Sequence, residues 1–218
     1  MTKRSKASKL KSTHSPNESS GGGEPSGGAS GGRYASRGYL KLEAALQAFD
    51  LDPTGHRCAD LGCSHGGFTD CLLRHGAQTV YAVDTAYGQL DYRLRTDPRV
   101  VVLERTNALH ADPPPDAAQQ CDLVVLDLGW TKQDKAVPAA LRWLSREPHA
   151  RIITLVKPHY ETGEHRLTDD QARQASEQVA REVLPTLGVE VLGLIDSPIP
   201  GGKGGNLEQL ALLKRYDT

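Results

Sequence analysis

Two acidic and two basic residues stand where charged side chains could meet in a ligand pocket. Asp127 and Lys157 each follow an apolar run, as L-V-V-L-D and I-T-L-V-K, so each charge comes at the end of an expected buried strand. Lys41 stands early in an expected helix, and Glu208 opens the last apolar run. Together the four would suit activation of a poor nucleophile such as a hydroxyl group, with one lysine as the base. From spacing alone, Lys41 and Glu208 could equally be exposed surface charges.

A glycine-rich turn between two expected strands indicates a cofactor site. The strand over Arg57–Leu61 runs into G-C-S-H-G-G, a helix follows, and the next strand ends on Asp84. A Rossmann-like sheet builds its pocket for a nucleoside-bearing cofactor in this order. A dinucleotide site needs G-x-G-x-x-G, whereas Gly62 and Gly66 are separated by three residues. The looser loop favours S-adenosylmethionine (SAM), with Asp84 placed to bind the ribose hydroxyls.

Apolar runs alternate with helical patterns along most of the chain. One helix is expected over residues 36–49, and another opens at Thr168 with a capping-box pairing to Gln171 and stops at Gly188. Seven strands are expected, over Arg57–Leu61, Thr79–Val83, Val100–Leu103, Leu123–Leu126, Ile152–Val156, Val189–Ile195 and Leu207–Leu213. The alternation predicts an α/β fold with a Rossmann-like, mostly parallel sheet covered on both faces. Only the loop P-I-P-G-G-K-G-G-N joins the last two runs, so we expect an antiparallel last strand.

The amino-terminal segment differs in composition from the rest. Residues 1–33 are mostly Ser, Gly, Lys and Arg without apolar periodicity, which predicts a disordered basic tail ahead of one folded domain over residues 34–218. The tail holds six basic and two acidic residues, which leaves 20 basic and 25 acidic residues in the body. An acidic body excludes a general polyanion binder, so any nucleic-acid contact must come from a local patch and the tail.

The cysteines and the lack of long apolar runs indicate the compartment. Cys58, Cys63, Cys71 and Cys121 form no C-x-x-C pair and have no histidine at zinc spacing, so no metal site is expected. They fit buried thiols in a reducing compartment. No run approaches the roughly 18 apolar residues of a membrane span, and the amino terminus lacks the apolar segment of a secretory signal. These features predict a cytoplasmic protein.

Several motifs together indicate a family. The matching stretches are Y-A-S-R-G-Y-L-K-L-E-A-A-L (34–46), D-L-G-C-S-H-G-G-F-T-D-C-L-L (60–73), Y-A-V-D-T-A-Y-G-Q-L (81–90), D-P-R-V-V-V-L-E-R-T-N (97–107), L-V-K-P-H-Y-E (155–161) and S-P-I-P-G-G-K-G-G-N-L-E (197–208). In these stretches the chain resembles the catalytic domain of the haemolysin-A-like (TlyA) ribosomal RNA methyltransferases, within the wider FtsJ-type family. The stretches span nearly the whole body of the chain.

The resemblance implies a SAM-dependent enzyme that methylates a ribose 2′-hydroxyl of ribosomal RNA with a Lys-Asp-Lys-Glu tetrad. The tetrad falls on Lys41, Asp127, Lys157 and Glu208. The implied cofactor-binding residues are Asp60, Gly62, Ser64, Gly66, Gly67, Phe68, Asp84 and Asn107, the last of them near the adenine.

Three departures from the family pattern fall where RNA contacts are expected. The basic tail stands where the family has a small S4-type RNA-binding domain, L-G-W-T-K follows Asp127 in place of V-S-F, and T-G-E-H-R-L replaces a glycine-rich loop. We expect an unpaired base to stack on Trp130 or Tyr160, and Arg37 and Lys203 to contact the RNA backbone. We expect the tail to act as a nonspecific RNA tether.

Other functions fit part of the pattern. The acidic body would suit a SAM-dependent methyltransferase of a small hydroxylated molecule. A SAM-binding, RNA-associated protein without catalysis would keep the same fold. Membrane lysis, which the haemolysin name suggests, would need an amphipathic or apolar segment that the sequence lacks.

Overall fold

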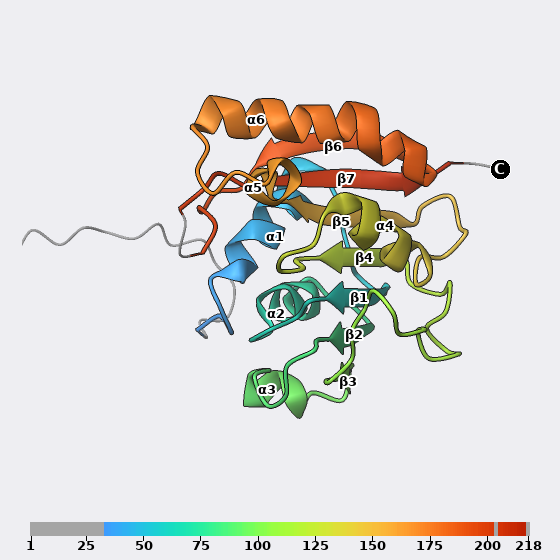
Figure 1. Cartoon of the computed structure of the whole chain (residues 1–218). Helices are drawn as coiled ribbons and strands as arrows, with labels where there is room; N and C mark the ends of the chain where they lie inside the picture. Colours follow the sequence, from blue (N-terminus) through green and yellow to red (C-terminus); the bar gives the residue numbers. More distant parts are fainter. Residues whose placement is uncertain (1–32, 203–204, 217–218) are drawn as a thin grey trace, which may run out of the picture. The chain divides into compact units, whose positions relative to one another are not determined.

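The computed structural model describes residues 33–202 and 205–216 (Figure 1). The predicted basic tail, apart from Arg33, lies outside these residues, and so does the predicted RNA contact Lys203. Within the described part, helices lie on both faces of a single sheet.

Seven strands of the described chain form this sheet. They are β1 (Arg57–Leu61), β2 (Thr79–Val83), β3 (Val100–Leu103), β4 (Leu123–Leu126), β5 (Arg151–Val156), β6 (Val189–Asp196) and β7 (Gln209–Arg215). Their order across the sheet is β3-β2-β1-β4-β5-β7-β6. The first five strands run parallel, and β7 is antiparallel to both β5 and β6. The predicted Rossmann-like α/β sheet with an antiparallel last strand is therefore confirmed.

Burial on both faces explains why the central strands are apolar throughout. Successive residues of a strand point to opposite faces of the sheet. In β4, Val124 and Leu126 belong to an apolar cluster with Trp143, whereas Val125 belongs to a second cluster with Leu42. A strand covered on both faces has no solvent-facing positions, so it shows no polar alternation.

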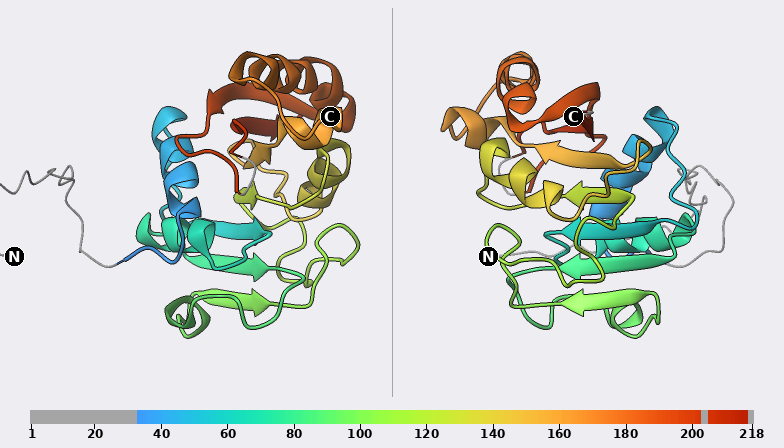
Figure 2. Two further views of the ribbon diagram at one scale, coloured as in Figure 1. Left: turned by 60° about the vertical axis from the view of Figure 1, so that its left-hand side comes forward. Right: turned by 90° about the vertical axis from the view of Figure 1, so that its right-hand side faces the viewer.

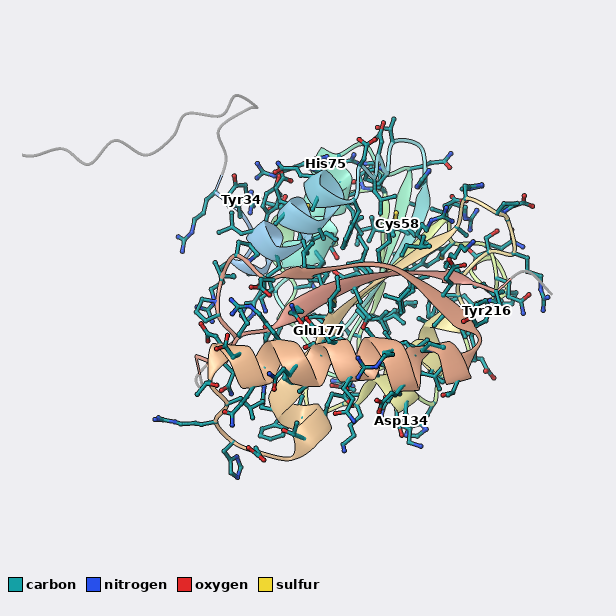
Figure 3. All side chains as sticks on the ribbon, turned by 90° about the horizontal axis from the view of Figure 1, so that it is seen from above. Tyr34, Cys58, His75, Asp134, Glu177 and Tyr216 are labelled. Carbon is teal, nitrogen blue, oxygen red and sulfur yellow. The ribbon has the colours of Figure 1, made fainter. Side chains whose placement is uncertain are left out.

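Helices cover both faces of the sheet (Figure 2). On one face lie α1 (Gly38–Ala48) and α2 (Gly67–Arg74), and on the other lie α4 (Gln133–Leu141) and α6 (Asp169–Gln178). Two shorter helices follow β2 and β5, namely α3 (Tyr92–Arg95) and α5 (Pro158–Thr162). Figure 3 shows α6 lying along the outer strands β6 and β7. Crossing a membrane takes a length and an apolar character that none of the helices in the described ranges has.

The predicted capping box opens α6. The Thr168 hydroxyl accepts a hydrogen bond from the backbone N–H of Gln171, whose side chain accepts one from the N–H of Thr168. The helical path continues through a π turn over Val179–Val183 and a 3-10 turn over Leu184–Leu187. It stops at Gly188, which has a φ of +80° and so adopts the left-handed conformation that ends many helices.

Several element boundaries differ from the prediction by one or two residues, and two of these differences lie near the predicted tetrad. The first helix begins at Gly38 rather than at Ser36, because the Ser36 hydroxyl accepts the N–H of Gly38 in a turn ahead of the helix. The last strand begins at Gln209, so Glu208 lies directly before the strand rather than in it. The backbone N–H of Ser197 still bonds to the carbonyl oxygen of Glu208 at 2.8 Å, which keeps this residue beside the end of β6.

Candidate active site

The ends of the central strands meet α1 at one edge of the sheet. Asp127 directly follows β4, Lys157 directly follows β5, and Glu208 directly precedes the antiparallel β7. Because β4, β5 and β7 are neighbours in the sheet, the three residues lie side by side at its edge. Helix α1 brings Lys41 to them from the face that it covers. The structure thus brings together all four residues of the predicted tetrad.

The four side chains form a continuous row of alternating charge. Lys157 Nζ lies 2.6 Å from Asp127 Oδ1. Lys41 Nζ lies 3.9 Å from Asp127 Oδ2 and 2.6 Å from Glu208 Oε2. Lys157 also donates a hydrogen bond to the carbonyl oxygen of Leu128 at 3.1 Å. Asp127 therefore lies between two ammonium groups, and Glu208 ends the row.

Most of this row is shielded from solvent. The side chains of Lys41, Lys157 and Glu208 are 9%, 11% and 4% exposed, whereas the Asp127 side chain is 28% exposed. A buried charge that loses its partner costs about 3–5 kcal/mol, so each member of the row holds its neighbours in place. Asp127 is the member most open to a ligand.

Gly62 allows the glycine loop to pass close to Asp127. Its φ is +96°, and a Cβ atom at this position would lie 2.6 Å from the carbonyl oxygen of Asp127. Gly67 is close to α1 in the same way, since a Cβ atom there would lie 2.8 Å from the backbone nitrogen of Tyr39. Gly66 lies between them as the N-cap residue of α2. The loop glycines therefore set the position of the tetrad relative to the predicted cofactor site.

Asp84 ties the glycine loop to the end of β2. One carboxylate oxygen accepts the backbone N–H of Ser64 at 2.8 Å, and the other accepts the N–H of Ala86 at 2.7 Å. Asn107 lies exposed beyond β3, where its side-chain oxygen accepts the N–H of Leu109 at 3.0 Å. The three predicted cofactor contacts Ser64, Asp84 and Asn107 thus lie at the carboxyl ends of three adjacent strands.

Asp60 and Phe68 lie beneath the loop rather than at its surface. Asp60 is fully buried, its Oδ2 accepts a hydrogen bond from the Thr69 hydroxyl at 2.7 Å, and its Oδ1 has no partner among the described residues. Burial raises the pKa of Asp60 to about 7, with the charges of Asp127 and Asp84 adding to the effect and the bonds from Thr69 opposing it. Phe68 packs in the apolar cluster of α1 and α2. Neither side chain is open to a ligand, so any effect of either on a cofactor would be indirect.

The charges around the loop fit a cationic cofactor. Asp84 directly follows β2 and Asp127 directly follows β4, and both carboxylates lie close enough to raise the pKa of the buried Asp60. SAM carries a sulfonium and an ammonium group against one carboxylate, so a net acidic environment stabilises it. The N-terminus of α2 beside the loop suits the single carboxylate. The residues present are therefore compatible with SAM.

A cleft of about 770 Å³ opens over the tetrad. Three predicted RNA contacts line it together with the tetrad, namely Arg37, Trp130 and Tyr160. Trp130 is 85% exposed and stacks on Tyr160, with the ring centroids 5.1 Å apart. Lys157 Nζ lies 5.8 Å from the centroid of the Tyr160 ring. An aromatic pair, with Trp130 exposed and Tyr160 half-buried, therefore lies directly beside the charged row.

His159 also lines the cleft, although the sequence motifs do not single it out. Its ring centroid lies 4.1 Å from that of Tyr160. Burial lowers the pKa of His159, the charges of Lys157 and His165 lower it further, and Glu208 opposes them. The imidazole is therefore mostly neutral at neutral pH and can hydrogen-bond a substrate without adding charge. In the sequence, the feature that could have pointed to His159 is its position two residues after Lys157, which ends an apolar run.

The fold and the loop at its edge define a class, the Rossmann-like methyltransferases. A solved structure from Listeria monocytogenes described as an S-adenosylmethionine-dependent methyltransferase has the same fold, with a TM-score of 0.60. The match covers 83% of this chain and 99% of that one at 16% identity, so it bears on the fold alone.

The sequence places the chain more closely within this class. The family model described as FtsJ-like methyltransferase matches residues 34–205, so the chain belongs to the FtsJ-like methyltransferase family. The 16S/23S rRNA (cytidine-2'-O)-methyltransferase TlyA of Mycobacterium tuberculosis is 42% identical over 187 residues, which make up 83% of this chain and 68% of that protein. A solved structure described as a hemolysin from Streptococcus thermophilus is 34% identical, with a TM-score of 0.77 over 88% of this chain and 70% of that one. The resemblance and the predicted enzyme class, a methyltransferase, are thereby confirmed.

Proposed function

We propose that this chain methylates a ribose 2′-hydroxyl of ribosomal RNA with SAM as the methyl donor. The observation that carries the proposal is the row of Lys157, Asp127, Lys41 and Glu208 beneath an open cleft. The relative TlyA, which is named for cytidine 2'-O-methylation of 16S and 23S rRNA, supports the choice of substrate. Such a reaction would take place in the cytoplasm, the compartment that the sequence predicts.

Lys157, once it has released a proton to solvent and is a neutral amine, is positioned to accept the proton that the ribose hydroxyl loses. SAM, when bound, supplies the methyl group and leaves as a neutral thioether. Lys157 takes up the proton at Nζ, and the resulting ammonium is held by Asp127 Oδ1 at 2.6 Å and by the carbonyl oxygen of Leu128 at 3.1 Å. Lys41 competes for the same carboxylate through Oδ2, which favours return of the proton to solvent. Glu208 keeps Lys41 in that position.

The glycine loop and the strand ends around it are the proposed cofactor site. The loop from Gly62 to Phe68 lies against the tetrad through the contact of Gly62 with Asp127. Each carboxylate oxygen of Asp84 accepts one backbone hydrogen bond, from Ser64 or Ala86, and has a further lone pair. With these lone pairs Asp84 would accept hydrogen bonds from the ribose hydroxyls of the cofactor. Asn107 would lie near the adenine.

The cleft offers contacts for an unpaired nucleotide. Trp130 presents an exposed ring that Tyr160 supports from behind, which is the arrangement that stacks a splayed-out base. Arg37 on the cleft wall could pair with a phosphate. A base on Trp130 would bring its ribose toward Lys157, because the ammonium of Lys157 lies near the supporting Tyr160 ring.

The substrate class can be tested by methyl transfer from labelled SAM. The purified chain is offered naked ribosomal RNA, small subunits and large subunits from a strain that lacks the gene, and in parallel a small-molecule extract of that strain. Label in one of the three RNA samples supports the proposal and locates the target. Label in the extract alone would establish a small-molecule methyltransferase instead, and SAM binding without any transfer would indicate a non-catalytic protein.

A further inference from the structure

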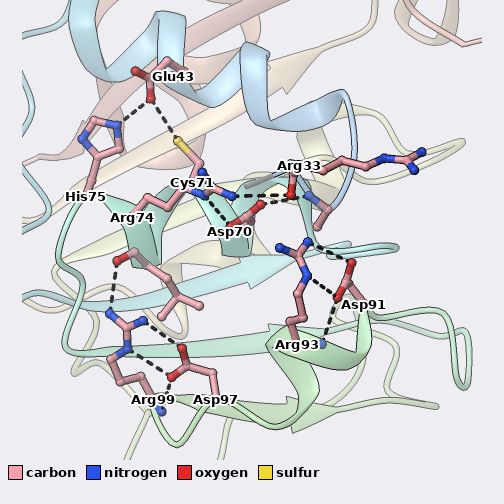
Figure 4. Close-up of polar contacts among 12 residues, drawn as sticks. Arg33, Glu43, Asp70, Cys71, Arg74, His75, Asp91, Arg93, Asp97 and Arg99 are labelled. Atoms are coloured by element: carbon pink, nitrogen blue, oxygen red, sulfur yellow. Dashed lines mark hydrogen bonds and ion pairs between the residues drawn. The ribbon is translucent and has the colours of Figure 1, made fainter. Parts of the chain in front are cut away.

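A second group of polar side chains lies between α1 and α2, outside the cleft. Glu43 comes from α1, Cys71 comes from α2, and His75 is the C-cap residue directly after α2 (Figure 4). Each side chain offers one metal-ligand atom, and the three atoms all lie within 4.8 Å of one another. Among the described residues, this is the one group of at least three such side chains that comes so close together. The prediction that the cysteines have no histidine at metal-binding spacing missed the pair Cys71 and His75.

Helix geometry builds this group. Cys71 and His75 are four residues apart, so they lie on the same face of α2. Glu43 reaches them because α1 packs closely on α2, an approach that Gly67 permits. The three ligand atoms are thus brought together by two packed helices and not by a flexible loop.

The distances suit tetrahedral coordination. The Cys71 sulfur lies 3.6 Å from Glu43 Oε2, and His75 Nε2 lies 2.5 Å from the same oxygen. In a tetrahedral zinc site with bonds of about 2.0–2.3 Å, ligand atoms are about 3.2–3.6 Å apart. The sulfur–oxygen pair already has this separation. The nitrogen–oxygen pair would open by less than about 1 Å, a change within reach of side-chain rotation.

We propose that Glu43, Cys71 and His75 bind a divalent cation of the zinc class, with water as the fourth ligand. Thiolate, imidazole and carboxylate are the three ligand types that Zn²⁺ combines in proteins. The side chains of His75 and Glu43 are 32% and 26% exposed, so the ion and its water can enter from solvent. Cys71 is fully buried and closes the inner side of the site.

Binding would release protons. Burial raises the pKa of the Cys71 thiol, with the charge of Glu43 adding to the effect, so the free thiol is protonated at neutral pH. Burial opposes ionisation of Glu43, but the hydrogen bond and charge of His75 hold its pKa below the ordinary value. The charge of Asp70 raises the pKa of the Cys71 thiol further, and the positive charge of Arg74 lowers it. The affinity for the ion therefore rises with pH, since the thiol must lose its proton to bind the ion.

A bound ion would stabilise the helix pair that frames the active site. Glu43 follows Lys41 by two residues on α1, and α2 begins directly after the glycine loop. Cross-linking these helices would fix Lys41 relative to that loop. This consequence rests on the proposed function, but the ion binding itself does not.

The test uses the tag-free full-length chain, freed of metal and titrated with Co²⁺ and then with Zn²⁺. We expect one Co²⁺ per chain with the absorption of a thiolate-to-cobalt charge transfer, which Zn²⁺ abolishes by displacement. Zn²⁺ at 100 times its Kd should raise Tm by about 5–10 °C. Cys71→Ser should lower the affinity at least about 100-fold and remove the absorption. Cys121→Ser, another buried cysteine, should change neither.

Several results would overturn the proposal. Absence of the charge-transfer absorption in the wild type would show that Cys71 is no ligand, and its persistence in Cys71→Ser would assign it to another cysteine. If Cys71→Ser does not fold, Glu43→Gln and His75→Gln at the partly exposed positions give the same test. Unchanged affinity in both would leave the group as an ion pair with a thiol donor and no metal.

Discussion

The ammonium nitrogen of Lys41 lies 2.6 Å from a carboxylate oxygen of Glu208, although 167 positions separate the two residues in the chain. Both side chains are almost fully buried, with 9% and 4% of their surface exposed. The contact therefore joins the first helix to the start of the last strand through a charge pair that water scarcely screens. It also holds Lys41 beside Asp127.

Removing the charge of Glu208 should destabilise the protein. In Glu208→Gln the buried Lys41 loses its close partner, and we expect the free energy of unfolding to fall by about 3 kcal/mol in denaturant titrations. The exposed pair Lys214–Glu190, at 3.0 Å, is the matched control, and Glu190→Gln should cost less than about 1 kcal/mol. The double variant Lys41→Met, Glu208→Gln should regain most of the loss. If Glu208→Gln and Glu190→Gln lowered the free energy of unfolding equally, the buried pair would contribute no more to stability than the surface pair.

A side chain at Gly62 should displace the tetrad. In Gly62→Ala the new Cβ atom would meet the carbonyl oxygen of Asp127 at 2.6 Å, and the φ of +96° adds strain of about 1–3 kcal/mol. Gly55→Ala has a φ of +75° with open space around it, so it measures the strain alone. A shift of about 1 Å in Asp127 should reduce the methyl-transfer rate about 100-fold. Wild-type activity in Gly62→Ala would mean that the loop and Asp127 move independently.

The stability of the cofactor-free protein should depend on pH through Asp60. Its pKa is about 7 in the folded chain against the ordinary value of 3.8, so the folded state holds a proton that the unfolded state releases between these values. The contribution to stability is thus present below about pH 4 and is lost by about pH 7, a total of about 4 kcal/mol. In Asp60→Asn this loss should disappear, as denaturant midpoints of both proteins from pH 4 to pH 8 would show. Parallel curves for the two proteins would place the folded pKa of Asp60 near its ordinary value.

Loss of the Trp130 ring should weaken RNA binding and leave folding unchanged. One stacked base contributes about 1–3 kcal/mol, so Trp130→Ala should raise the Kd for RNA about 5- to 150-fold without changing Tm or SAM affinity. Tyr92→Ala provides the control, because that ring is 76% exposed but belongs to α3 and does not line the cleft. RNA binding that suffers equally in both variants would argue against a specific stacking site.

The parts that the sequence predicts well are those in which local pattern and position coincide. Asp127 and Lys157 each end a continuous apolar run, and such residues reach the ligand edge of a parallel sheet whatever the other details of the fold. Lys41 and Glu208 carry no such local signal, and only the family resemblance placed them beside the others. Their contact depends on how α1 lies against the sheet, which is a tertiary property.

Other features depend on packing that the sequence pattern does not express. Asp60 reads as part of the cofactor motif, but its side chain points into the interior toward Thr69. The group of Glu43, Cys71 and His75 is not apparent from the sequence, because Glu43 lies on another helix 28 positions before Cys71. The helix pair that unites them is set by the close approach at Gly67.

The position of the transferred methyl group tests the central claim most directly. The purified chain is incubated with SAM and its preferred ribosomal RNA, and the RNA is digested to nucleosides and examined by mass spectrometry beside a reaction with Lys157→Met. We expect a nucleoside methylated on the ribose, formed by the wild type and absent with Lys157→Met, while that variant still binds SAM. A methyl group on the base, or an unchanged yield with Lys157→Met, would contradict it.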